Sequence, residues 1–335
     1  MKKKIIFGVS EPFSLNKEMC KNLEFCGYDV VDISINPKYK YTSILDRAKN
    51  FFYKTFLGDK SYKNTLRLKK YSADFEKKIK ENAPFDYALI IRPDLYPIDF
   101  LNIIKNNSKK MIGYQWDGLS VFPEIYKYIP LFDRFFVFDK VDVKNGLLPL
   151  TNFYFDYQLD KNENKSKNKS VYFVGNYFKN RINLMKLMAI AINKAGFRSE
   201  INVFTHKDKV KKKHTHLGIH FMESFIGFEE NLKNVKNAAV LLDFLNDVHN
   251  GLSLRAFEAI GYEKKLITNN VNIKEYDFYN ENNIFIFNEN NISEIEDFLK
   301  KPYIKIEDSI RKKYSFSNWI KYVLDENPHQ KITLP

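Results

Sequence analysis

The chain has 335 residues, of which 44% are hydrophobic and 16% aromatic, and its formal net charge is +13. This apolar content excludes a disordered chain, and the length suits two domains of ordinary size. The two cysteines, Cys20 and Cys26, exclude a disulfide framework, so we expect a reducing, cytoplasmic setting. No apolar run is long enough for a transmembrane helix, and the run after the N-terminal lysines is too short for a signal peptide.

The first half of the chain alternates predicted strands with predicted helices. Strands are predicted at Lys4–Val9, Asp29–Ile33, Tyr87–Ile91, Lys110–Tyr114 and Phe135–Phe138, and helices at Ser14–Cys26, Lys38–Lys80 and Ile98–Lys105. Polar residues follow one strand end after another. This pattern is typical of a parallel sheet whose carboxyl edge forms a lined crevice.

The segment from Lys38 to Lys80 is strongly basic, with 13 Lys and Arg against 4 Asp and Glu, a local excess of +9. Aromatic residues are interleaved with these charges, at Tyr39, Tyr41, Phe51, Phe52, Tyr53, Phe56, Tyr62 and Tyr71. Such a face suits an anionic membrane surface, where each Lys or Arg near the lipid contributes about 1 kcal/mol. The alternative is a solvated face with ordinary core aromatics. Nucleic acid is not expected as a partner, because no recognisable binding module occurs.

Residues 160–170 (DKNENKSKNKS) carry no apolar side chain and are predicted to form a polar linker, after which the βα alternation restarts. Elements are predicted at Val171–Val174, Arg181–Ala195, Ile201–Thr205, Leu232–Ala238, Ala239–Phe244, Ser253–Gly261, Lys265–Thr268 and Ile284–Phe287, with closing helices at Ile292–Lys300 and Ile310–Leu324. The predicted fold class is therefore α/β, with two Rossmann-like doubly wound domains facing a cleft. The first domain would span 1–159, the second 171–309, and a C-terminal helix and tail 310–335.

The loop after the first strand of the second half opens a long helix and is a candidate phosphate site. Backbone N–H groups and the positive helix end would face an anion there. Gly175 would let the backbone approach closely, Asn176 and Tyr177 lie beside it, and Lys179 or Arg181 would neutralise the charge. The loop is neither a G-x-G-x-x-G nor a Walker motif, so neither NAD nor ATP is indicated. The alternative is a plain strand-to-helix turn.

The stretch Asn250–Asn270 (NGLSLRAFEAIGYEKKLITNN) is the most informative part of the chain. With the predicted strand at Ala239–Phe244 it makes strand, loop, helix and strand within about 35 residues, the period of a βαβ unit. Arg255 and Glu258 lie at the head of its helix, where ligands bind at the carboxyl ends of parallel strands. The alternative for Glu258 is a carboxylate stabilised only by the helix dipole.

A family resemblance rests on several segments of the second half. They are Val171–Gly175 (VYFVG), Arg181, Ala239–Asp243, Ser253–Ala259 (SLRAFEA), Asn272–Asn288 and Tyr314–Trp319. Together they resemble the nucleotide-binding half of GT-B glycosyltransferases, in particular bacterial lipopolysaccharide and capsule biosynthesis enzymes of the group-1 type. The first half resembles the family only in its βα pattern and in Phe132–Lys140 (FDRFFVFDK).

The resemblance implies that a nucleotide sugar is the substrate and that no further cofactor is needed. Glu258 would bond the ribose hydroxyls, since a carboxylate accepts two hydrogen bonds. The family often carries an earlier Glu in the same segment, and here that position is Asn250, so the sugar and the stereochemistry stay open. His249 or Arg255 would face the phosphates. Gly251 and Ser253 complete the expected donor site.

Catalytic candidates lie at predicted strand ends of the first half. Asp117, beside Trp116, is the first candidate for a general base that activates an acceptor hydroxyl, and Glu11 is the second. Arg92 and Asp94 line the same edge and are assigned to the acceptor. The alternative for each carboxylate is ordinary turn or capping chemistry.

No metal site is expected. His206, His214, His216 and His220 lack cysteine partners and stand beside the run KDKVKKK, which would repel a cation. Arg, Lys and helix dipoles would stabilise the leaving diphosphate instead.

We therefore expect a glycosyltransferase that extends a bacterial surface glycan and acts in the cytoplasm, held at the inner face of the membrane. The alternatives are a nucleotide-sugar epimerase of the same fold and a non-catalytic nucleotide-sugar-binding protein.

Overall fold

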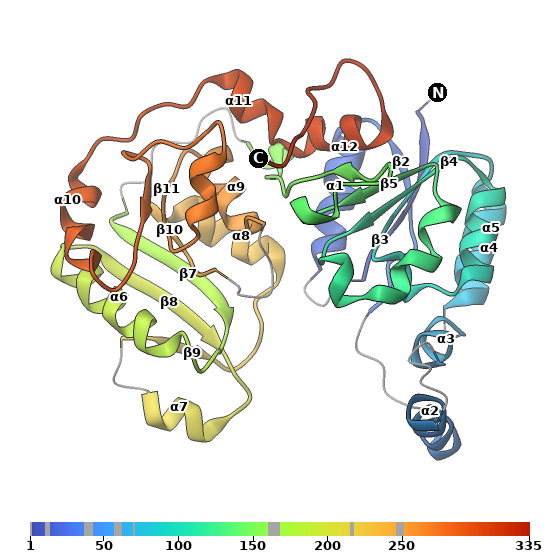
Figure 1. The fold of residues 1–335 in the computed structure, drawn as a ribbon, viewed down its shortest axis with the longest axis horizontal. Coiled ribbons are helices and arrows are strands. Elements are labelled where there is room, and N and C mark those ends of the chain that lie inside the picture. The colour runs from blue at the N-terminus through green and yellow to red at the C-terminus, as the bar shows by residue number, and fades with distance from the viewer. Residues whose placement is uncertain are drawn as a thin grey trace. The chain divides into compact units, whose positions relative to one another are not determined.

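The computed structural model describes residues 2–10, 14–36, 43–56, 62–69, 71–159, 168–214, 218–245 and 251–335. The chain forms two compact units, each built on a six-stranded sheet (Figure 1). Unit 1 comprises Met1–Leu150 and Ile320–His329, and unit 2 comprises Thr151–Trp319 and Gln330–Thr333, apart from the last two residues of the chain. The last helix is thus shared, because its second half belongs to unit 1.

The sheet of unit 1 has the strand order β2-β1-β3-β4-β5-β6, and its neighbouring strands are parallel. Its strands are β1 (Lys4–Gly8), β2 (Asp29–Asp32), β3 (Phe85–Ile91), β4 (Ser108–Gln115), β5 (Arg134–Val137) and β6 (Leu148–Pro149). Its longer helices are α1 (Leu15–Phe25), α2 (Ile44–Phe56), α3 (Tyr62–Lys69), α4 (Ser72–Asn82) and α5 (Ile98–Asn106). The order reverses at β1, as in a doubly wound sheet.

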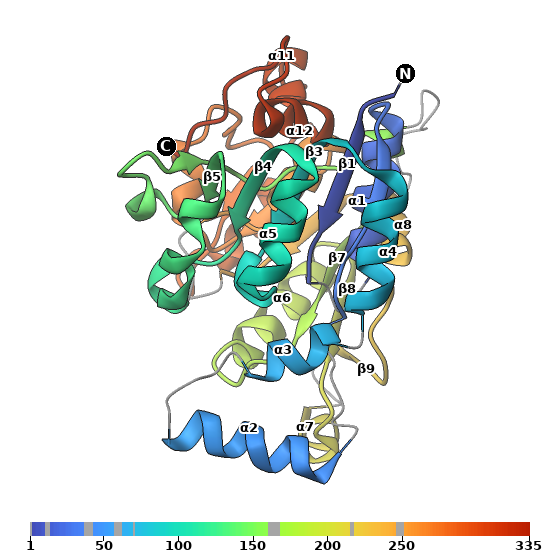
Figure 2. The ribbon, with the colours of Figure 1, turned by 90° about the vertical axis from the view of Figure 1, so that its right-hand side faces the viewer.

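Helices cover both faces of this sheet. On one face, apolar residues of α4 and α5 such as Ile79 and Phe100 pack in one core with strand residues such as Ile90 and Met111. Figures 1 and 2 show α4 and α5 together on this side, and Figure 1 shows α1 on the other. Long, buried strands flanked by amphipathic helices account for the βα alternation in the sequence.

The basic segment 38–80 is helical within its described parts, as predicted, but it is not one helix. It forms α2, α3 and α4. Helix α4 packs on the sheet through buried Phe75 and Ile79, and Leu68 of α3 joins the same core. Figures 1 and 2 show α3 and then α2 extending beyond the end of α4. Residues 37–42, 57–61 and 70 lie outside the description.

The sheet of unit 2 is also parallel, with the order β12-β11-β10-β7-β8-β9. Its strands are β7 (Ser170–Asn176), β8 (Arg198–Phe204), β9 (His220–Met222), β10 (Val240–Asp243), β11 (Lys265–Thr268) and β12 (Ile284–Ile286). Its helices are α6 (Ile182–Lys194), α7 (Asp208–His214), α8 (Phe228–Asn237), α9 (Leu254–Gly261), α10 (Ile295–Lys300) and α11 (Asp308–Lys313). Helices α6 and α10 share one core with alternate strand residues, while α8 and α9 lie on the opposite side (Figure 1).

The sequence analysis was wrong about the last helix. It predicted one helix over Ile310–Leu324, and the structure has α11 and then α12 (Phe316–Leu324). The helix breaks because the backbone around Ser315 pairs with Tyr154, which donates to the carbonyl of Tyr314 and accepts from Phe316. The α/β fold class, with two doubly wound parallel sheets, is confirmed.

Candidate functional site

The carboxyl ends of the neighbouring strands β7 and β10 meet at Arg255, on the first turn of α9. Its guanidinium donates to Oδ1 of Asp243, the last residue of β10, over 3.1 Å, and to the carbonyl of Val174 on β7 over 2.8 Å. The same guanidinium lies 5.0 Å from the ring centre of Phe173. Arg255 therefore joins two strands and a helix at the edge where ligands bind in this kind of sheet. Its bonds to protein groups make it a positioning residue there.

Glu258, one turn further along α9, is only 3% exposed. Burial raises the pKa of its carboxyl from about 4.5 to about 7, an effect that Arg255 opposes and Asp243 reinforces. Among the described residues, no hydrogen bond holds this carboxylate. Because a buried charge without hydrogen bonds is costly, the site is ready for a ligand that donates to it.

The residues before α9 add two further groups. Ser253 is the N-cap of α9, yet its hydroxyl caps nothing and is buried without a hydrogen-bond partner in the described part of the chain. Gly251 and Leu252 are held through their carbonyls, by the amides of Asn270 and Asn152 respectively. His249 and Asn250 lie outside the described residues. The N-terminal end of α9 thus presents an unused hydroxyl beside a positive helix end.

The candidate phosphate loop follows β7. Gly175 is still in the strand, and a Cβ there would lie 2.7 Å from the Phe173 ring, so its place is explained by that ring without any ligand. The Tyr177 backbone donates to the Phe204 carbonyl, which fixes the loop to β8. Asn176 and Lys179 are exposed, and Arg181 lies over the ring of Phe178 at 4.5 Å before α6 begins.

A close contact that the sequence analysis did not anticipate holds α9 in place. Gly261, at the end of α9, packs on the ring of Tyr154, and a Cβ at this glycine would lie 2.1 Å from the ring carbon Cγ. The hydroxyl of Tyr262, the next residue, donates to the carbonyl of Phe155 over 3.0 Å. Glycine before a helix end is a common sequence feature, and nothing local distinguishes this one.

In unit 1, Arg92 organises the polar residues at the ends of β3 and β4. It adopts a left-handed backbone conformation, with φ of 60°. Its guanidinium binds Asp94 through two hydrogen bonds of 2.8 Å, and Nη1 donates to Oδ2 of Asp117 over 2.6 Å. The ring centre of Phe122 lies 4.0 Å from the guanidinium. The structure therefore brings together three predicted residues, and a non-glycine residue with positive φ is a feature of functional sites.

Two neighbouring side chains of β4 and its end lack hydrogen bonds. The indole Nε1 of Trp116 is buried without a partner among the described residues. Gln115 is 0% exposed, and neither atom of its amide forms a hydrogen bond within the described structure. Buried amides without partners are rare, because each unmade bond costs roughly 1–3 kcal/mol. The sequence analysis did not identify Gln115, which directly follows the strand predicted at Lys110–Tyr114. Glu11, the second candidate base, lies outside the described residues.

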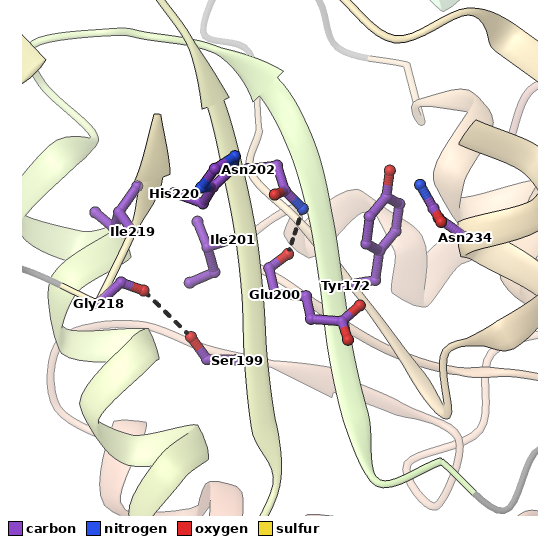
Figure 3. Close-up of a pocket in the computed structure, with 9 residues that line it drawn as sticks. All are labelled: Tyr172, Ser199, Glu200, Ile201, Asn202, Gly218, Ile219, His220 and Asn234. Carbon is purple, nitrogen blue, oxygen red and sulfur yellow. Dashed lines mark hydrogen bonds between the residues drawn. The ribbon is translucent and has the colours of Figure 1, made fainter. Parts of the chain in front are cut away.

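A hollow of about 540 Å³ opens on the sheet of unit 2 (Figure 3). It is lined by Tyr172, Ser199, Glu200, Ile201, Asn202, Gly218, Ile219, His220 and Asn234. Figure 3 shows these residues on β7, β8, β9 and the two positions before β9, with Asn234 on α8. Ser199 and His220 lie near the beginnings of their strands, so the hollow is away from the carboxyl edge. We therefore do not include it in the candidate site.

The histidines that the structure describes contact aromatic rings or line the hollow. His206 packs edge-on against Phe204, His220 lines the hollow on β9, and His216 lies outside the description. Among the residues that the structure describes, no group of three His, Cys, Asp or Glu side chains could hold a metal ion. Within the same residues, no helix combines the length and the apolar character that a membrane crossing requires.

Comparison with solved structures shows where this fold occurs. S. aureus MnaA, determined with UDP, covers 98% of this chain with all of its own, at 15% identity and a TM-score of 0.52. The UDP-GlcNAc 2-epimerase from Methanocaldococcus jannaschii aligns over 96% of this chain and 99% of its own length, with 14% sequence identity and a TM-score of 0.52. A glycosyltransferase from Rickettsia africae aligns over 97% of each chain, with 12% sequence identity and a TM-score of 0.52.

No family model matches the sequence, and no curated protein matches it. Identities this low show the fold alone. The predicted two-domain GT-B fold is confirmed, and its known examples include both a glycosyltransferase and a nucleotide-sugar epimerase.

Proposed function

We propose that this protein is a glycosyltransferase that moves a sugar from a nucleotide-sugar donor to a growing bacterial surface glycan. The observation that carries the proposal is the pair Arg255 and Glu258 on α9, at the carboxyl edge of the second sheet. There a carboxylate that is buried, and that no described residue hydrogen-bonds, lies where a ribose would offer two donors.

The donor would bind to unit 2. Its ribose hydroxyls would donate to Glu258, while Arg255 keeps α9 aligned with β7 and β10. The diphosphate would meet the exposed Lys179, Arg181 and the beginning of α6, with His249, Asn250, Gly251 and Ser253 at the second helix end. Positive charge and backbone N–H groups would then stabilise the departing diphosphate without a metal ion.

The acceptor would bind to unit 1, at the ends of β3 and β4. Arg92 and Asp94 would hold its hydroxyl groups, and the Trp116 indole could donate to one of them. Asp117 would take the proton from the acceptor hydroxyl. The oxygen of that hydroxyl would bond to the sugar carbon as the bond to the departing nucleotide diphosphate breaks. The bond from Arg92 to Asp117 would orient this carboxylate. Glu11 is the second candidate for the base.

The setting would be the inner face of the cell membrane, where lipid-linked saccharides serve as acceptors. The support is the local charge excess of +9 between Lys38 and Lys80. Cationic residues near anionic lipid favour residence at the surface.

A nucleotide-sugar epimerase is the second candidate, because the M. jannaschii epimerase shares the fold over almost the whole of both chains. The two candidates differ in what they need. An epimerase turns over a nucleotide sugar alone, whereas a transferase needs an acceptor to do more than slow hydrolysis. A binding protein without chemistry would do neither.

The first experiment is a thermal-shift screen with UDP, GDP, ADP, CMP and their sugars. The correct donor should raise the melting temperature, since a ligand at about 100 times its Kd stabilises by about 2.7 kcal/mol. No shift with any nucleotide would overturn the donor site.

The second experiment uses Asp117→Asn. The variant should keep the nucleotide-induced rise in melting temperature. Its rate of sugar transfer should fall by about 10²- to 10⁴-fold, the usual contribution of a general base. Unchanged transfer would remove Asp117 from the mechanism. A new epimer formed from the donor alone, followed by NMR, would favour the epimerase.

A further inference from the structure

Helix α2 is amphipathic, but its apolar side faces solvent, whereas the apolar side of a helix in a folded domain normally faces the core. All thirteen of its residues are described, and none is buried. Its large apolar side chains face solvent, with Ile44 88%, Phe51 64% and Phe56 69% exposed, and Leu45 and Phe52 are exposed as well. At 100° per residue, these five lie within an arc of about 140°.

The opposite side of α2 is the one that contacts the protein. The partly buried residues are Ser43, just before the helix, and Asp46, Asn50 and Tyr53, which follow one another at helical spacing. Tyr53 stacks on Tyr62 of α3, with ring centres 4.6 Å apart and planes 6° apart. The polar side is thus attached to unit 1, and the apolar side is turned away from it.

Cationic residues border the exposed apolar arc. At the same helical spacing Lys49 lies beside Phe56 at one edge, and Arg47 and Lys54 lie beyond Phe51 at the other. All three are exposed. An apolar face between two cationic edges is the arrangement of helices that lie in the interface of an anionic bilayer.

We propose that the apolar face of α2 inserts into the surface of an anionic lipid bilayer, with Arg47, Lys49 and Lys54 on the headgroups. A second copy of this chain would leave these cations facing cations, and nucleic acid would leave the five apolar side chains in water. Lipid satisfies both parts of the surface. The inference rests on the proposed function for its membrane setting, but the binding itself needs neither donor nor acceptor.

The test is flotation of the full chain with phosphatidylglycerol–phosphatidylcholine vesicles and with pure phosphatidylcholine vesicles. We expect binding to the mixed vesicles that falls as salt rises. The double variant Phe51→Gln, Phe56→Gln should weaken it about tenfold or more, because two inserted rings are lost. Lys49→Gln with Lys54→Gln should weaken binding to the mixed vesicles alone.

The matched control is Phe25→Gln, which removes a ring that is 63% exposed at the end of α1, a helix whose last turn carries no basic residue. It should leave vesicle binding unchanged. Thermal unfolding checks that each variant is folded. No binding to mixed vesicles, or equal loss in the Phe25 variant, would overturn the proposal.

Two other outcomes would also overturn it. One is a dimer in light scattering that the Phe51, Phe56 variant converts to a monomer without any vesicle binding. The other is binding of an oligonucleotide that depends on Lys49 and Lys54 but not on the two phenylalanines. Nucleotide thermal shifts measured on the same variants separate the two proposals. If the donor site is wrong, vesicle flotation is unchanged, and if the membrane proposal is wrong, the nucleotide shifts are unchanged.

Discussion

In each unit an arginine lies with two carboxylates at the carboxyl ends of strands, yet the two groups differ in how these charges are paired. In unit 1, the Arg92 guanidinium binds Asp94 twice and Asp117 once. In unit 2, Arg255 binds Asp243 and a backbone carbonyl, and no such bond reaches Glu258 from the described residues. The formal charge of each group is the same.

The difference lies in what each group still needs. The unit 1 carboxylates are bonded and partly exposed, so they are stable as charges without a ligand. Glu258 is buried, and the pKa of its carboxyl is raised to about 7, mainly by loss of water. A ligand that donates hydrogen bonds would therefore change the second group far more than the first.

The largest expected effect is that of Glu258→Gln on stability against pH. A carboxyl whose pKa rises from about 4.5 to about 7 on folding favours the folded state below pH 4.5, and this advantage is lost as the pH rises through 7. The free energy of unfolding of the native protein would therefore fall by about 3 kcal/mol as the pH rises through this range. At pH 8 the variant should therefore be more stable than the native protein, and at pH 4.5 nearly equal, by urea unfolding.

The matched substitution in unit 1 should act in the opposite direction. Asp94→Asn removes charge-assisted bonds to Arg92 and should lower the free energy of unfolding by about 1–2 kcal/mol at neutral pH. If both variants were destabilised alike at pH 8, the two groups would not differ as described. Under the proposed function, nucleotide binding should tighten from pH 6 to pH 8 in the native protein only, since the ionised Glu258 would accept hydrogen bonds from a ribose.

The alternation of elements could be predicted because its signals are local. Runs such as those of β1 and β11 are apolar and bounded by polar residues, and the structure places them within a residue or two of the prediction. The break between α11 and α12 could not be predicted. It depends on Tyr154, about 160 positions earlier in the chain, which competes for the backbone hydrogen bonds of a helix.

The candidate site was predictable only as a set of positions. Strand ends point to Arg92, Asp117 and Arg255, because ligands bind at that edge. The partners of these residues follow from packing: Asp117 is 25 positions from Arg92, and the Val174 carbonyl is 81 positions from Arg255. Gln115 could not be found either, since its lack of partners appears only when the neighbouring atoms are placed.

A second test breaks the unit 2 group without touching its charges. Gly261→Ala would drive a Cβ into the Tyr154 ring, so α9 must shift and carry Arg255 and Glu258 with it. We expect a loss of about 2 kcal/mol in unfolding free energy and a weaker nucleotide thermal shift. The control is Gly227→Ala, where the added Cβ meets nothing within 4 Å and only the cap of α8 is changed. Equal effects of the two substitutions would show that α9 tolerates the displacement.

The smallest expected effect concerns the buried Gln115 amide, two positions before Asp117. Gln115→Met keeps the length of the side chain and removes two polar atoms that have no partners within the described structure. Replacing unmet polar atoms by apolar ones of similar shape should raise the free energy of unfolding by about 1 kcal/mol. If the amide hydrogen-bonds an acceptor hydroxyl, the variant should show a higher KM for the acceptor and unchanged nucleotide binding. A loss of stability would instead mean that the amide is already satisfied by bound water, and unit 1 would then be complete without its ligand.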